Sequence, residues 1–134
     1  MPRVLVNSEL FEPIGPYSHV VKAGHQIFVS GTPGVVPATG LLAGQAAYEQ
    51  SLQAFLNVKA CVEAAGGEES DIAHVQVHLV NVGDFSEMNR AYAEVFSQPY
   101  PARTVIGIAA LPKAGALLTV NAVAVLSAAA MALP

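Results

Sequence analysis

Two histidines four residues apart, His74 and His78, raise the question of a metal site. On a helix this spacing would place both rings on one face. The segment from His74 to Val80, however, alternates apolar and polar residues, which predicts a half-buried strand. On a strand the two Cα atoms stand about 13 Å apart, beyond the joint reach of one ion. We therefore expect no metal site.

The single cysteine, Cys61, limits thiol chemistry. One cysteine forms no internal disulfide, and a zinc knuckle needs at least a second. Cys61 lies at the edge of the apolar stripe of a predicted helix, where a thiol usually serves as a small hydrophobic side chain, although a nucleophilic role is the alternative. The sequence has no G-x-S-x-G motif, so no nucleophilic serine of that type is expected.

Arg103 is the most informative charged residue, because it enters an apolar, β-branched run with little other charge nearby. An unpaired guanidinium in such a setting is costly, so it must find an anion or reach water. Its planar fork matches a carboxylate through two parallel hydrogen bonds. Two interpretations follow from the residues alone: Arg103 binds the carboxylate of a ligand, or it forms a structural ion pair with an Asp or Glu.

The elements that would position these residues alternate between strand and helix patterns. Gly66 and Gly67 should end the first helix, and Asp84 with Glu87 resembles a capping box at the start of the second. An irregular loop is expected over 32–44. Strands are predicted at 3–6, in the two halves of 20–30, and at 74–80, 104–110 and 117–126, with helices over 48–65 and 84–96.

This order of elements predicts one α+β domain, residues 1–134, with both helices on one face of a mixed sheet. In the last strand Thr119 and Asn121 share a polar side. The other face of the sheet then needs a partner, and the composition, 53% hydrophobic and 12% charged, also favours oligomerisation. Residues 127–134 are expected to form a loosely packed tail.

The composition also bears on location and on partners. The longest apolar stretch, 120–134, contains polar residues and is shorter than the roughly 20 residues of a membrane span. The first ten residues lack the apolar core of a signal peptide. A cytoplasmic location without membrane contact is therefore expected. The net charge of −4 and the lack of basic runs argue against nucleic-acid binding.

Five segments then show a resemblance to a known family. They are IGPYSHVVKAG from Ile14, IFVSGTPG from Ile27, SLQAFLNVKACVEAAGG from Ser51, VNVGDFSEMNRAYAEVF from Val80 and YPARTVIGIAALPK from Tyr100. With these segments the chain resembles the Rid/YjgF family, also called the endoribonuclease L-PSP family, from about Pro13 to Val125. The resemblance implies a chorismate-mutase-like α+β fold and a homotrimer with clefts between neighbouring subunits.

The resemblance also implies an activity that needs neither metal nor cofactor. Members of the family hydrolyse enamines and imines such as 2-aminoacrylate and 2-iminopropanoate to 2-oxo acids and ammonia. Arg103 matches the carboxylate-binding arginine of the family. The residues that match the lining of the cleft are Tyr17, Ser30, Gly31 and Asn89.

Three positions depart from the family pattern. Asn121 stands where active deaminases usually have a glutamate, and an amide cannot take a proton from water. Val105 stands where a cysteine is common. His19 stands where many members have glutamine, either as an acid or base beside Tyr17 or as a surface histidine.

Three alternatives to this function stay open. The stretches GPYSHVVKAG, FVSGT and LVNVGDF also resemble the 2-aminomuconate deaminase branch, which would imply a longer dicarboxylate enamine as substrate. An arginine kept without the glutamate also suits a non-catalytic trimer that binds small carboxylates. Family members are described as endoribonucleases too, but the acidic balance of this chain argues against RNA binding.

Overall fold

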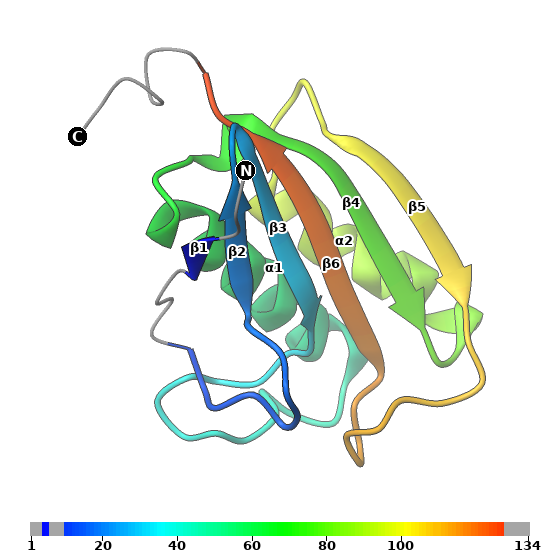
Figure 1. The fold of residues 1–134 in the computed structure, drawn as a ribbon. Helices are drawn as coiled ribbons and strands as arrows, with labels where there is room; N and C mark the ends of the chain where they lie inside the picture. The colour runs from blue at the N-terminus through cyan, green and yellow to red at the C-terminus, as the bar shows by residue number, and fades with distance from the viewer. Residues whose placement is uncertain (1–3, 6–9, 128–134) are drawn as a thin grey trace.

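The computed structural model describes residues 4–5 and 10–127 as a six-stranded sheet with two helices on one face (Figure 1). The remainder of the predicted loose tail beyond Ser127 lies outside the described residues. The strands are β1 (Val4–Leu5), β2 (Val20–Ala23), β3 (Gln26–Thr32), β4 (Ile72–Leu79), β5 (Ala102–Gly107) and β6 (Leu118–Val125). The helices are α1 (Ala47–Ala64) and α2 (Phe85–Val95), with short 3-10 turns η1 (Glu69–Asp71) and η2 (Val82–Asp84).

The sheet is mixed, as predicted. Its strand order is β1-β2-β3-β6-β4-β5, in which β4 and β5 are parallel and all other neighbours are antiparallel. The last strand of the chain therefore lies in the middle of the sheet, and β5 is an edge strand. A register shift between Val29 and Thr32 interrupts the pairing of β3 with β6.

Both helices pack on the same face of the sheet, which confirms the predicted α+β layering (Figure 1). The apolar stripe of α1 is buried, with Phe55, Val58 and Val62 at 0% exposure. Phe55 meets Tyr92 of α2 edge to face, with 5.2 Å between ring centroids. Burying each such side chain contributes about 1.5–3 kcal/mol, so this apolar packing stabilises the helix layer on the sheet.

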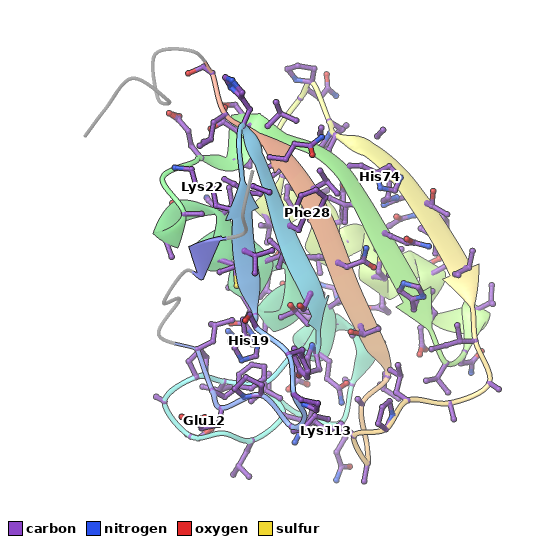
Figure 2. All side chains as sticks on the ribbon, viewed as in Figure 1. Glu12, His19, Lys22, Phe28, His74 and Lys113 are labelled. Carbon is purple, nitrogen blue, oxygen red and sulfur yellow. The ribbon has the colours of Figure 1, made fainter. Side chains whose placement is uncertain are left out.

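The other face of the sheet has no covering layer within the described residues. Phe28 and Ile106 are 39% and 40% exposed there, and Figure 2 shows Phe28 and His74 on this open side. Along β6, the odd positions 119, 121 and 123 are half-buried while the even positions are buried. The predicted division of the last strand into a polar and a core side is therefore confirmed.

The ends of the helices agree with the sequence in one case and differ in the other. Gly66 has φ +94°, so it ends α1 in the left-handed conformation that glycine favours. The predicted capping box of α2 is wrong, because the Asp84 side chain makes no capping bond. Asp84 is already part of η2, and it is Asn81 Oδ1 that accepts from the Gly83 N–H at the start of that turn. Neither helix in the described part combines the length and hydropathy needed to cross a membrane.

Candidate functional site

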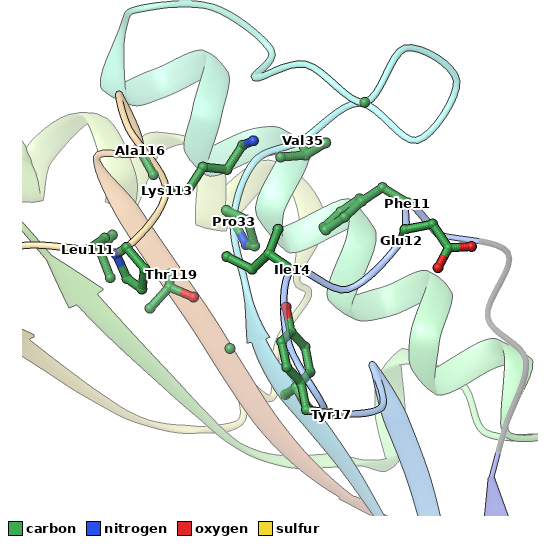
Figure 3. Close-up of a pocket in the computed structure, with 14 residues that line it drawn as sticks. Phe11, Glu12, Ile14, Tyr17, Pro33, Val35, Leu111, Lys113, Ala116 and Thr119 are labelled. Carbon is green, nitrogen blue, oxygen red and sulfur yellow. The ribbon is translucent and has the colours of Figure 1, made fainter.

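A cavity of about 750 Å³ lies between the segment before β2, the end of β3 and the start of β6 (Figure 3). Tyr17, Ser30 and Gly31, three of the predicted site residues, line it together with Thr119. Most of the lining is apolar, and Lys113 and Glu12 add one group of each charge. The cavity can therefore accept a small organic molecule with an apolar body and a polar or charged group.

The cavity wall depends on a close approach between two strands. A Cβ on Gly31 would stand 3.0 Å from Thr119 Oγ1, so only glycine lets the strands meet here without a shift. Ser30 Oγ donates to the Ser18 carbonyl at 2.6 Å, which uses the hydroxyl proton to hold the preceding segment. Figure 3 shows the Tyr17 ring at the cavity, and its side chain is 39% exposed.

Gln50, which the sequence did not single out, holds two cavity loops together. It is fully buried on α1, and its amide donates to the carbonyls of Gly44 and Gly115 at 2.8 and 3.0 Å. Its oxygen accepts from the Leu117 N–H at 2.8 Å. These three hydrogen bonds from one buried side chain hold the loop that carries Lys113 against the 32–44 loop. A polar residue on the apolar side of a helix was the only signal of this role.

Arg103 projects from β5 toward the helices rather than toward the cavity. Its NH1 donates to Asn89 Oδ1 at 2.8 Å, and the guanidinium lies 4.6 Å from the Tyr92 ring centroid and 5.8 Å from that of Phe85. Asn89, another predicted site residue, is thus its direct partner. Within residues 10–127 the ion pair formed is Arg90 with Glu87, so Arg103 pairs with no carboxylate there. Among the described residues, the structural ion pair considered from the sequence is therefore not formed.

The predicted residues therefore form two separate groups in one chain. Ser30 and Thr119 lie on the open side of the sheet, whereas Arg103 and Asn89 lie on the helix side of its far edge strand. Strands β6 and β4 stand between β3 and β5. A small substrate cannot reach both groups within one chain.

Asn121 lies on the open side, two residues along β6 from the cavity residue Thr119. Its Oδ1 is 3.1 Å from His78 Nε2 on β4. His78 is directly opposite Thr119 in the β4–β6 register. The structure thus joins Asn121 to a histidine that the sequence analysis had considered only as a metal ligand, and had rejected in that role. In the described part no group of three His, Cys, Asp or Glu side chains could hold a metal ion.

His19 is buried, at 8% exposure, so the interpretation as a surface histidine is wrong. Its Nε2 lies 2.5 Å from the Phe11 carbonyl, which can only accept, so this nitrogen carries the proton. The ring packs edge to face against Phe11 and Tyr17, with centroid distances of 4.8 and 5.9 Å. His19 supports the Tyr17 ring from behind and is not one of the residues that line the cavity.

One titrating group beside Arg103 is perturbed. Burial raises the pKa of the Tyr92 phenol above its ordinary value, and the positive charge of Arg103 opposes part of that rise. The Tyr92 hydroxyl is buried without a hydrogen-bond partner in the described structure. Tyr92 therefore presents a neutral ring to the guanidinium at physiological pH.

Comparison with known proteins places these features in a family. The family model of endoribonuclease L-PSP matches residues 7–126. A RutC family protein of Pyrococcus horikoshii is 37% identical over 92% of this chain and 98% of its own length. A 2-iminobutanoate/2-iminopropanoate deaminase of Dermatophagoides farinae is also 37% identical, over 84% of this chain and 88% of its own.

A solved structure agrees with the sequence comparisons. The crystal structure of E. coli TdcF with bound serine superposes with a TM-score of 0.85 at 32% identity, and the match covers 92% of this chain and 99% of that one. The α+β fold that the resemblance implied is thereby confirmed, with two helices on one face of a mixed sheet. From its motifs, its fold and these relatives, the chain belongs to the endoribonuclease L-PSP family, which includes the Rid and RutC proteins.

Proposed function

We propose that this protein hydrolyses carboxylate-bearing imines and enamines, of the 2-iminopropanoate and 2-aminoacrylate type, to 2-oxo acids and ammonia. The observation that carries the proposal is Arg103, a half-buried guanidinium that has an amide and two aromatic rings around it but no carboxylate among residues 10–127. An anionic ligand would supply the missing partner. The relative named 2-iminobutanoate/2-iminopropanoate deaminase and the relative solved with serine bound both support a substrate with an amino-acid carboxylate.

The chemistry needs few protein groups. In the imine form, R–C(=NH)–COO⁻, the carbon is already electrophilic, and an enamine reaches this form by a proton shift. Water adds to that carbon and loses a proton, and the nitrogen gains protons until the C–N bond breaks. Ammonia then leaves and a 2-oxo acid remains. Arg103 would hold the carboxylate, so the main contributions are positioning and electrostatics, with no cofactor required.

The active site would be completed by a second copy of the chain. Arg103 and the cavity lie on opposite sides of the sheet of one chain, so the arginine of one subunit would face the cavity of its neighbour. The uncovered sheet face with exposed Phe28 and Ile106 offers apolar surface for such contacts. A homotrimer with three equivalent sites satisfies this requirement with closed symmetry.

Subunit complementation tests the shared site. Arg103→Ala removes the arginine group, and Gly31→Val pushes side-chain atoms against Thr119 and into the cavity. When the two variants are co-expressed in equal amounts, each mixed trimer has one intact site, so about a quarter of the wild-type rate should return. Co-expressing Arg103→Ala with the double variant should restore nothing. A mixture no more active than its separate components contradicts a site shared between subunits.

The activity itself is tested with imines generated in place by an amino-acid oxidase, while ammonia and 2-oxo acid are measured. Release of both products above the spontaneous rate is the expected result. Binding of a 2-oxo acid without turnover would instead identify a non-catalytic carboxylate-binding protein. Cleavage of RNA by nuclease-free protein would favour the endoribonuclease alternative.

A longer dicarboxylate enamine, of the 2-aminomuconate type, is a second candidate substrate. Lys113 is the cationic residue among those that line the cavity, whose wall also contains Glu12, and a second carboxylate could pair with this lysine. Lys113→Gln should then raise KM for a dicarboxylate at least fivefold and leave KM for 2-iminopropanoate unchanged. Equal effects on both substrates would remove the support for this candidate.

A further inference from the structure

We propose that His78, held in one tautomer by Asn121, is the proton acceptor that activates water in this chain. The inference rests on the proposed deaminase function and names the base that Asn121 itself cannot be. An amide has no basic lone pair at neutral pH, whereas imidazole is the side chain best suited to accept a proton there. His78 is thereby given a catalytic role, and Asn121 becomes a positioning residue.

The hydrogen bond between the two side chains assigns their roles. His78 Nε2 lies 3.1 Å from Asn121 Oδ1, and a carbonyl oxygen of an amide can only accept. His78 Nε2 therefore carries the hydrogen and donates it. In the neutral ring the other nitrogen, Nδ1, then has the free lone pair, and in the described part of the chain Nδ1 has no hydrogen-bond partner. Asn121 leaves His78 with its basic nitrogen unoccupied.

The position of His78 suits a water at the cavity wall. His78 pairs with Thr119 in the β4–β6 register, and Thr119 lines the cavity. Directly opposite side chains on neighbouring strands have Cβ atoms about 5 Å apart, so His78 is a neighbour of the cavity residue Thr119, although it is not itself among the residues that line the cavity. Asn121 lies one step further along the same side of β6.

The surroundings of His78 contain little other charge. On the open side of the sheet, β6 contributes Thr119 and Asn121, and β5 contributes Ile106, which pairs with His78, and Thr104, whose Oγ1 is 3.2 Å from His74 Nε2. None of these four β5 and β6 side chains carries a charge. On β4 itself His74 lies four residues away with Gln76 between the two histidines, and the ionisable residues that line the cavity are Glu12, Tyr17 and Lys113.

The proton balance follows from this arrangement. As water adds to the imine carbon, its oxygen forms the new C–O bond and His78 Nδ1 takes one of its protons. The imidazolium returns that proton to the amino nitrogen of the addition product. His78 Nδ1 next takes the hydroxyl proton of this adduct and delivers it to the same nitrogen, so that the carbonyl forms as the C–N bond breaks with its electron pair on nitrogen, and ammonia leaves. His78 ends neutral, so no other reactant is consumed.

The test compares His78→Gln with the matched variant His74→Gln on the same strand and the same side of the sheet. His78→Gln should lower kcat about 100-fold, with KM and 2-oxo acid affinity changed less than threefold, because a positioned base contributes about 10²-fold or more. The dependence of kcat on pH should change in His78→Gln, because that variant has lost the acid–base group. His74→Gln should keep both the rate and the pH profile.

The positioning role of Asn121 has its own variants and a readout that needs no turnover. Asn121→Asp keeps an oxygen acceptor and should retain activity, whereas Asn121→Leu should lose about tenfold in kcat. Nitrogen-15 NMR of the imidazole should show His78 as the Nε2–H tautomer in the natural protein and a mixture in Asn121→Leu. Thermal unfolding and oligomer mass of each variant show whether it has kept its fold.

The outcomes separate this inference from the proposed function. If the natural protein is active and His78→Gln keeps kcat within threefold, His78 is not the base, while the proposed deaminase function still stands. The Nδ1–H tautomer would also overturn it, because the basic nitrogen would then face Asn121. If the natural protein releases no ammonia from any imine, the proposed deaminase function is wrong, and the proposed role of His78 is wrong with it.

Discussion

Replacing Arg103 by alanine should lower the deamination rate by about 30-fold to 1000-fold. In the structure one N–H of NH1 is already used by Asn89, which leaves the other donors of the guanidinium for a ligand. A hydrogen bond to a charged group contributes about 1.5–3 kcal/mol, so losing a bidentate pair should cost about 2–4 kcal/mol. At about 1.4 kcal/mol per factor of ten, that range gives the predicted loss.

Two further variants sharpen the Arg103 experiment. Arg103→Lys keeps the charge but not the planar fork, so its rate should fall between those of the natural protein and Arg103→Ala. Arg90→Ala is the matched control, because Arg90 lies on the exposed side of α2 with an ion pair to Glu87 at 2.6 Å and stacks on Tyr48. Exposed pairs contribute about 0–1 kcal/mol, so this variant should keep its rate.

The measurements are the release of ammonia and 2-oxo acid, the affinity for pyruvate or 2-oxobutyrate, and the thermal stability and mass of each variant. A structural arginine would show itself by a large drop in melting temperature or by dissociation, with little effect on the surviving assembly. If Arg103→Ala stays assembled and keeps both rate and affinity within a factor of two, the carboxylate is not bound by Arg103 and the reasoning fails.

Three other predictions use the same protein. Sedimentation equilibrium at micromolar concentration should give about three times the 13.9 kDa chain mass, and a stable monomer would contradict the shared site. Asn121→Glu should raise or at least keep activity toward small imino acids, because a carboxylate can accept a proton; complete loss would mean that the amide binds a particular substrate. Tyr92→Phe should leave stability unchanged or raise it by about 1 kcal/mol at pH 8, because it removes a buried hydroxyl without a partner. Burial raises the pKa of Tyr92 in the folded chain, so above about pH 10.0 the phenol ionises more readily in the unfolded chain and the folded state loses stability. Tyr92→Phe has no phenol proton to lose, so thermal unfolding should show a smaller loss of stability for this variant at that pH.

The local elements of the fold could be predicted because their signals lie close together in the chain. The stripe through Phe55, Val58 and Val62 has helical spacing, and Gly66 supplies the left-handed residue at its end. The strand order could not be predicted, since nothing in the residues of β6 states that it inserts between β3 and β4. The capping box failed for a local reason, because η2 takes Asp84 into a turn before α2 begins.

The candidate site was predictable in its residue types but not in its contacts. The charge balance and the apolar surroundings marked Arg103, yet only the fold shows that Asn89 and not a carboxylate is its partner. His78 and Asn121 each lie on the polar side of an alternating strand, but their meeting depends on β4 and β6 being neighbours. The burial of His19 could not be predicted, because Phe11, which packs against its ring, comes from an irregular segment without a periodic signal.

The separation of the two groups gives a physical reason for assembly. A guanidinium on the helix side and a cavity on the open side cannot meet in one chain without one of them crossing the sheet. Placing Arg103 on the edge strand β5 removes that obstacle, since an edge has no further strand beyond it and a neighbouring subunit can approach there. The same approach would cover Phe28 and Ile106. Apolar burial and completion of the site would then be one event, so a variant that weakens assembly should lose activity in proportion to the trimer that remains.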